Sequence, residues 1–184
     1  MIKITPEGIH YVAKTLIIYD YVDLETLKFY DYEKVIFLNY DSMDIEKIKL
    51  LKDASIQVFK GIEIYKNEKK SSDVVKIASL KDTSIEDSIK FANVIYDLEL
   101  SEKPDSLRYR SSNFNQVFAK QFVEKNIILG IQMENLLLND KILGRIKQNL
   151  IIARQYKVPV LVSVFNGKRI FGWYEAMQFL RSLF

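Results

Sequence analysis

Short apolar runs alternate with stretches of helical spacing along most of this chain. The segment 56–64 alternates around Gly61 and predicts either one bent strand or two short ones. The run at 158–164 is apolar almost throughout, which is typical of a parallel strand covered on both faces. Further runs rich in β-branched and aromatic residues predict strands at 15–18, 35–39, 73–78, 94–98 and 127–133.

The intervals between these runs have helical patterns. Ser84 precedes one of them and can cap it together with Asp87, three residues later. Ser111 and Ser112 can cap another helix, in which the apolar side chains share one face. Those apolar side chains are Phe114, Val117, Phe118 and Phe122. The remaining helices are predicted at 24–30, 43–51, 139–156 and 173–184.

The longest predicted helix, 139–156, carries cations on both edges of its apolar stripe. Its predicted buried residues are Ile142, Leu143, Ile146, Leu150 and Ala153. At 100° per residue, Lys141 and Arg145 lie along one edge of that stripe. Lys147 and Arg154 lie along the other edge.

Repeated strand and helix units predict an α/β protein with a parallel sheet. The pattern alone leaves open whether the sheet is an open doubly wound one or a TIM-barrel-like (βα) barrel. Because about seven strands are fewer than the usual eight, we expect such a barrel to be irregular or incompletely closed. The chain has 184 residues, 48% of them hydrophobic, which suits a single core and a single domain spanning 1–184.

Charge divides the chain into two unlike halves. Residues 1–100 carry 14 lysines and no arginine against 18 acidic residues, whereas residues 101–184 carry 13 basic and 6 acidic residues. Every arginine lies in the second half. Since the guanidinium fork matches phosphate oxygens and stacks on bases, this asymmetry indicates an anionic partner, with a merely solvated basic face as the alternative.

Several kinds of chemistry lack their residues. The sequence has no cysteine and a single histidine, His10, which makes thiolate chemistry impossible and a zinc or histidine-based catalytic site improbable. Its six glycines form no dinucleotide-binding, Walker or nucleophile-elbow motif. There is no apolar run of eighteen residues and no signal-peptide core, so we expect a soluble, cytoplasmic protein without a membrane partner.

Acidic residues at strand ends keep an enzyme reading open. Asp20, Asn39, Asp41 and Asp97 lie at or just after predicted strands, where a barrel places catalytic groups if those are its carboxyl ends. Carboxylates of this kind bind Mg²⁺ or carry glycoside chemistry. The alternative is structural, because Asp41 precedes a predicted helix and is well placed to cap it.

Basic residues of the second half are the main functional candidates. Arg108 and Arg110 precede a helix, and Lys168 and Arg169 occupy a turn near aromatic residues. Cations beside aromatic rings suit phosphate contacts and base stacking in structured RNA. The candidate RNA-binding residues are Arg108, Arg110, Lys120, Arg145, Lys147, Arg154, Lys168 and Arg169, of which Arg154, Lys168 and Arg169 are the strongest.

The second half also resembles a known family. The segment 111–120 is similar to a helix of the protein component 3 family of archaeal ribonuclease P, also called the 30-kilodalton subunit, in its asparagine followed by Ala119 and Lys120. The strand at 126–133 and the double leucine at 136–137 follow in the same order. The series then continues with Arg145, Asn149, Ala153, Arg154, Tyr156, Pro159 and Val160, ending near Ser163. The resemblance covers residues 108–180.

Membership of that family implies a barrel related to metal-dependent phosphoesterases of the polymerase and histidinol phosphatase type, without their metal ligands. It implies pairing with a small ferredoxin-like subunit, as a heterodimer or a two-plus-two heterotetramer. Other partners would be the ribonuclease P RNA, further ribonuclease P proteins and, indirectly, precursor tRNA. The RNA removes the 5′ leader and requires Mg²⁺, while the protein binds no cofactor.

We therefore expect a scaffold subunit that supports a catalytic RNA and has no active site of its own. The second reading is a free-standing Mg²⁺-dependent phosphoesterase barrel that uses Asp20, Asp41 and Asp97. The third is a protein-interaction barrel that never contacts nucleic acid. Salt dependence separates the first reading from the third, because phosphate contacts weaken steeply as salt rises.

Overall fold

The apolar runs form the strands of a barrel, and the helical patterns form its outer layer. We describe a computed structural model of the chain, which covers residues 2–4, 10–12, 14–18, 22–64, 74–106, 110–137, 139–165, 170 and 172–183. The strands are β1 (Ile2–Ile4), β2 (His10–Val12), β3 (Thr15–Ile18), β4 (Lys34–Phe37), β5 (Gln57–Glu63), β6 (Val75–Ser79), β7 (Val94–Tyr96), β8 (Ile128–Gln132) and β9 (Val160–Ser163).

Helices follow most of these strands. The α-helices are α1 (Leu24–Phe29), α2 (Ile45–Asp53), α3 (Ile85–Phe91), α4 (Gln116–Glu124), α5 (Asp140–Tyr156) and α6 (Trp173–Ser182), and two 3₁₀ turns are η1 (Tyr40–Ser42) and η2 (Met133–Leu137). The predicted segment 56–64 is the single strand β5. Sequence analysis missed the short strands β1 and β2.

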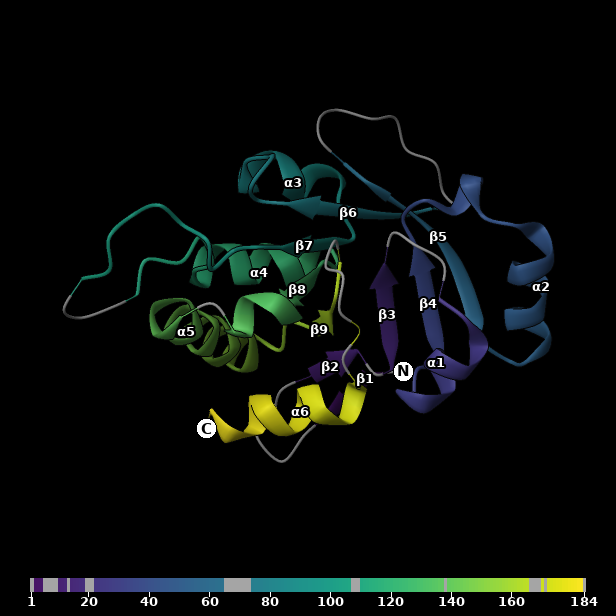
Figure 1. Cartoon of the computed structure of the whole chain (residues 1–184). Coiled ribbons are helices and arrows are strands. Elements are labelled where there is room, and N and C mark those ends of the chain that lie inside the picture. The colour runs from purple at the N-terminus through teal and green to yellow at the C-terminus, as the bar shows by residue number, and fades with distance from the viewer. Residues whose placement is uncertain are drawn as a thin grey trace.

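Strands β3 to β9 are parallel and lie side by side in chain order, which confirms the predicted barrel-like α/β fold. The sheet closes almost completely and leaves one seam, between β3 and β9. In Figure 1, α4 and α5 cover one flank of the barrel, α1 and α2 lie at the opposite flank, and α6 crosses in front of β1 and β2.

The seam is bridged in two ways. At the start of β9, β2 pairs with it in parallel, and Tyr11 lies opposite Val160. Lys14 then adopts a left-handed φ of 53°, which turns the chain between β2 and β3. At the end of β9, the Ser163 hydroxyl oxygen accepts a hydrogen bond from the Ile17 backbone N–H at 2.6 Å. A side chain thus replaces part of the missing ladder.

Two apolar layers hold the fold together. The barrel interior is filled by Ile17, Ile36, Ile77, Val94, Tyr96, Leu161 and Phe165. The Tyr96 and Phe165 rings stack there with centroids 4.3 Å apart. A Cβ atom on Gly130 would come within 2.8 Å of both rings' side chains, so this position requires glycine. A larger apolar layer separates the sheet from the helices.

Two predicted helix starts are wrong. Helix α4 begins at Gln116 because the Asn115 side chain accepts from the Val117 and Phe118 N–H groups, and Ser111 and Ser112 lie outside it. Val117, predicted to be buried, is 62% exposed. Helix α2 is capped by Asp44, which accepts from the Glu46 N–H.

Candidate functional site

Exposed cations lie on two neighbouring helices, α4 and α5. Helices α4 and α5 pack against each other on one flank of the barrel (Figure 1). Lys120 is exposed on α4, and Lys147 and Arg154 are exposed on α5. Lys147 and Arg154 are seven residues apart, so they lie on the same edge of α5, about 10 Å from each other along its axis.

Arg110 reaches this flank from the loop that precedes α4. Its backbone N–H donates to Gln148 Oε1 and its carbonyl accepts from Gln148 Nε2, both at 2.9 Å. The Arg110 side chain is half exposed and forms an ion pair with Asp105 at 3.2 Å. A Cβ atom on Gly144 would lie 3.0 Å from Arg110 Nε, so that glycine of α5 makes room for the guanidinium.

Arg145 does not belong to this surface, and the prediction that it contacts RNA is wrong. Its residue surface is only 1% exposed. Nε donates to Asp105 Oδ1 at 2.8 Å, and the two terminal nitrogens donate to three carbonyls at 2.5 to 3.1 Å. Those carbonyls belong to Glu99, Ser101 and Lys103. The guanidinium therefore organises the loop between β7 and α4 and is turned away from solvent.

The Asp105 carboxylate, which accepts from Arg145, also accepts hydrogen bonds from other groups of the same loop. Partial burial acts to raise the pKa of Asp105, but bonds from the Ser111 backbone N–H, Arg145 and Arg110 outweigh it and lower the pKa to about 2. The Ser111 hydroxyl donates to the Pro104 carbonyl in the same loop. Asp105 was not predicted, because an acidic residue in a long loop shows no periodicity that marks it.

Three of the predicted RNA-binding residues lie outside the described part of the chain: Arg108, Lys168 and Arg169. Their assignment stays a prediction. Arg110, Lys120, Lys147 and Arg154 are exposed on the α4 and α5 flank, as a surface role requires.

A second polar cluster lies at the carboxyl ends of β6 and β7. Asn135, in η2, donates to Asp97 Oδ1 at 2.8 Å and to Glu99 Oε1 at 2.6 Å. Asp97 also accepts from the Ser79 hydroxyl at 2.7 Å and lies 3.6 Å from the Lys81 ammonium. One amide thus bridges two buried carboxylates.

Glu99 has fewer hydrogen-bond partners than Asp97 in this cluster. Burial raises the pKa of the Glu99 carboxyl to about 7, and the bond from Asn135 offsets only part of that rise. Its Oε2 atom makes no hydrogen bond within the described residues, and neither does Gln132 Oε1. Part of the Glu99 population is therefore protonated near neutral pH.

The acidic residues of the enzyme reading take part in separate networks. Asp41 is exposed and binds Lys60 Nζ with both carboxylate oxygens, at 2.7 and 2.5 Å. It does not cap α2, contrary to one expectation. Asp97 is bound to Ser79 and Asn135, and Asp20 lies outside the described residues. Within the part of the chain that the structure describes, no three acidic or histidine side chains form a metal-binding group.

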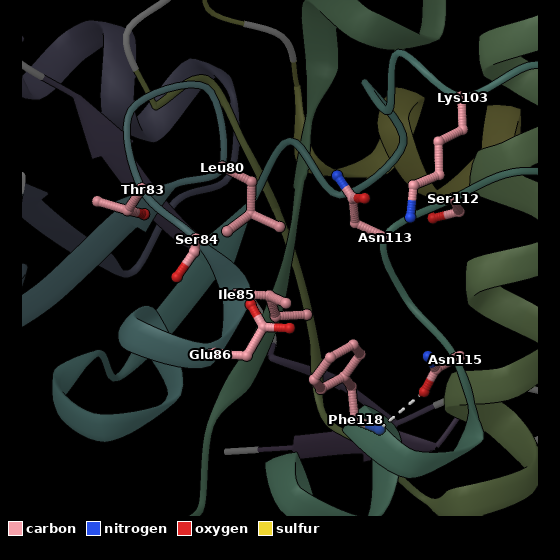
Figure 2. A pocket seen from close by; sticks show the side chains of 10 residues that line it. All are labelled: Leu80, Thr83, Ser84, Ile85, Glu86, Lys103, Ser112, Asn113, Asn115 and Phe118. Atoms are coloured by element: carbon pink, nitrogen blue, oxygen red, sulfur yellow. Dashed lines mark hydrogen bonds between the residues drawn. The ribbon is translucent and has the colours of Figure 1, made fainter.

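A polar hollow of about 340 Å³ lies between the turn that follows β6 and the start of α4. Figure 2 shows Leu80, Thr83 and Ser84 on one side and Asn113, Ser112 and Lys103 on the other. The helix N–H groups near it are already used, because Ser84 caps α3 and Asn115 caps α4. Glu86 also lines the hollow, so Lys103 does not make it uniformly positive.

Comparison of the sequence with models of known protein families and with curated proteins gives no match. The family resemblance in residues 108–180 therefore stays a prediction. Among the described helices, none combines the length and the apolarity needed to cross a lipid bilayer.

Proposed function

We propose that this chain is a non-catalytic protein subunit of an archaeal ribonuclease P, which acts in the cytoplasm on precursor tRNA. The observation that supports this best is the exposed cation set on α4, α5 and the preceding loop: Arg110, Lys120, Lys147 and Arg154. The barrel-like fold agrees with the family that the sequence resembles, and the acidic candidates Asp41 and Asp97 bind separate partners.

In this proposal the α4 and α5 flank contacts RNA phosphates and stabilises the catalytically competent fold of the RNA. Phosphate contacts release counterions, so binding weakens as salt rises, by a slope of about 0.9 per neutralised phosphate on a double-logarithmic plot. The RNA supplies the active site and needs Mg²⁺. A small ferredoxin-like subunit is the proposed protein partner.

The test is a reconstituted particle containing the double variant Lys120→Glu/Lys147→Glu. We expect cleavage of precursor tRNA to fall at limiting Mg²⁺ and to recover as Mg²⁺ rises, because the lost contacts stabilise the RNA fold. The salt slope of RNA binding should become shallower by about one for each contact removed.

The matched control is Lys28→Glu/Lys47→Glu, which makes the same charge change at exposed positions of α1 and α2. It should leave cleavage and the salt slope unchanged. Equal effects of the two variants would show that the net charge of the protein causes the effect and that the α4 and α5 flank has no special role. Cleavage of precursor tRNA by the isolated protein, without RNA, would refute the proposal and favour the phosphoesterase reading.

A further inference from the structure

A groove lies between η1 and α2, on the flank of the barrel opposite α4 and α5 (Figure 1). It has a volume of about 440 Å³. Tyr40, Asp41 and Met43 line it from the η1 side. Helix α2 contributes the other wall, formed by Ile45, Ile48, Lys49 and Lys52.

The α2 wall is a single helical stripe with two chemical halves. Its residues follow the spacing i, i+3, i+4 and i+7, which places them on one edge of the helix. The first two are apolar, and the last two are lysines. Ile48 is buried and forms part of the floor, whereas Ile45 is 81% exposed. An exposed isoleucine beside the partly buried Met43 leaves an apolar surface that a partner side chain can cover.

The charge available in this groove is positive. Lys49 and Lys52 are exposed, and their ammonium groups form no hydrogen bond or ion pair with any residue that the structure describes. The acidic residue of the groove, Asp41, is bound through both carboxylate oxygens by Lys60. The groove thus combines an apolar end with two exposed ammonium groups that are not paired with any residue of the described chain.

We propose that this groove docks an acidic, amphipathic segment of a partner protein. An apolar side chain of the segment would lie among Tyr40, Met43 and Ile45, and its carboxylates would pair with Lys49 and Lys52. From Ile45 to Lys52 the helix rises about 10 Å, so the carboxylates lie one to two helical turns from the apolar anchor. Charge complementarity selects acidic segments over basic ones.

This inference does not depend on the proposed function. The groove is on the flank away from α4 and α5, so a protein segment and an RNA can bind at the same time (Figure 1). The apolar end also favours a peptide over RNA, because phosphate contacts use cations and gain nothing from an isoleucine.

The test uses two synthetic helical peptides and the ¹⁵N-labelled full chain. One peptide carries a leucine with glutamates one and two turns later, and the other has lysines in place of the glutamates. We expect the glutamate peptide to shift the backbone amide signals of Met43, Ile45 and Lys49 saturably. The lysine peptide should leave these signals unchanged.

A charge-swap variant makes the test specific. The variant Lys49→Glu/Lys52→Glu should bind the glutamate peptide with about tenfold lower affinity than the original chain does. It should also bind the lysine peptide, which the original chain does not. Both substitutions are at exposed positions, so the thermal midpoint should be retained. The control Lys28→Glu/Lys47→Glu should bind the glutamate peptide as the original chain does.

Three outcomes would overturn the inference. The first is that neither peptide shifts the groove signals, and the second is that both peptides shift them equally. The third is that single-stranded oligouridylate shifts them while the glutamate peptide does not. The last outcome would make the groove an RNA contact. None of these results bears on the variants of α4 and α5, so failure here and failure of the proposed function are distinguishable.

Discussion

At the scale of single residues, Glu99 is a buried carboxyl group whose protonation affects the stability of the fold. It is completely buried, it shares Asn135 with Asp97, and its pKa is raised to about 7 by burial. The folded state therefore binds the Glu99 proton more tightly than the unfolded state does. The stabilising contribution is complete below the unfolded pKa of about 4.5 and is lost as the pH rises through about 7.

We expect the free energy of unfolding to fall by on the order of 3 kcal/mol between pH 4.5 and pH 7 because of this group, and Glu99→Gln should remove that dependence. Glutamine keeps an acceptor for Asn135 and cannot ionise. Urea denaturation at a series of pH values measures the effect. The exposed Glu86→Gln is the matched control and should leave the pH dependence of the free energy of unfolding unchanged. If Glu99→Gln also leaves it unchanged, another group causes the pH dependence.

The sequence pattern places the side chains of α5 correctly around the helix but does not give their depth. The 100° rule puts Arg145 at the edge of the α5 stripe, which is where it lies. The loop between β7 and α4 then folds over that edge and buries it, and no periodicity reveals that. Asn135 and the bond between Asp105 and Arg145 were missed for the same reason, since Asn135 binds Glu99 across 36 residues and Asp105 binds Arg145 across 40.

At the scale of elements, the loop between β7 and α4 depends on one side chain. Arg145 gathers the Glu99, Ser101 and Lys103 carbonyls and the Asp105 carboxylate, and Gln148 holds the Arg110 backbone one turn later. All of these bonds join the loop to α5. A long segment without regular structure is thereby fixed to a rigid helix.

Arg145→Ala should lower the free energy of unfolding by about 3–5 kcal/mol, because three carbonyls lose the donor that Arg145 supplies and the Asp105 carboxylate keeps only Ser111 and Arg110 as partners among the described residues. Arg145→Lys should restore only part of it, since an ammonium cannot reproduce the planar fork. Chemical denaturation measures both. The exposed Lys120→Ala should stay within about 0.5 kcal/mol of the original chain. An Arg145→Ala protein of full stability would mean that the loop is held by other contacts.

Helix positions were easier to predict than helix starts. The apolar stripes of α4 and α5 fix where each helix packs. Several polar residues in front of a helix can serve as its cap, and only backbone geometry decides which one does. Asn115 caps α4 while Ser112 donates to the Leu98 carbonyl, and Asp44 caps α2 while Asp41 binds Lys60.

At the scale of the whole molecule, two contacts bridge the seam of the barrel: the pairing of β2 with β9 and the Ser163 hydroxyl. Among the described residues, the hydroxyl accepts from the Ile17 N–H where β3 and β9 have no backbone ladder between them. Strand number and alternation predicted the barrel-like fold. The low number of strands also predicted incomplete closure. The way the seam is bridged could not be predicted, because it involves β2, a strand of three residues with no apolar run of its own.

Ser163→Ala should lower the free energy of unfolding by about 1–3 kcal/mol, because the buried Ile17 N–H loses its acceptor. Amide hydrogen exchange should locate the effect, with protection lost at Ile17 and retained at Leu129 in the middle of the sheet. Ser182→Ala, at an exposed position of α6, is the control. Unchanged protection at Ile17 would show that the seam is closed by other means.

The same seam sets an order of events during synthesis. Ile17 and Ser163 are 146 residues apart, so the first parallel strand emerges from the ribosome long before its neighbour exists. Until β9 has been translated, a nascent chain presents the open edges of β3 and of β8. Contacts between such distant residues slow folding and leave strand edges prone to mispairing. Translation of β9 thus covers the open edge of β8 and gives β3 its contact with Ser163 across the seam.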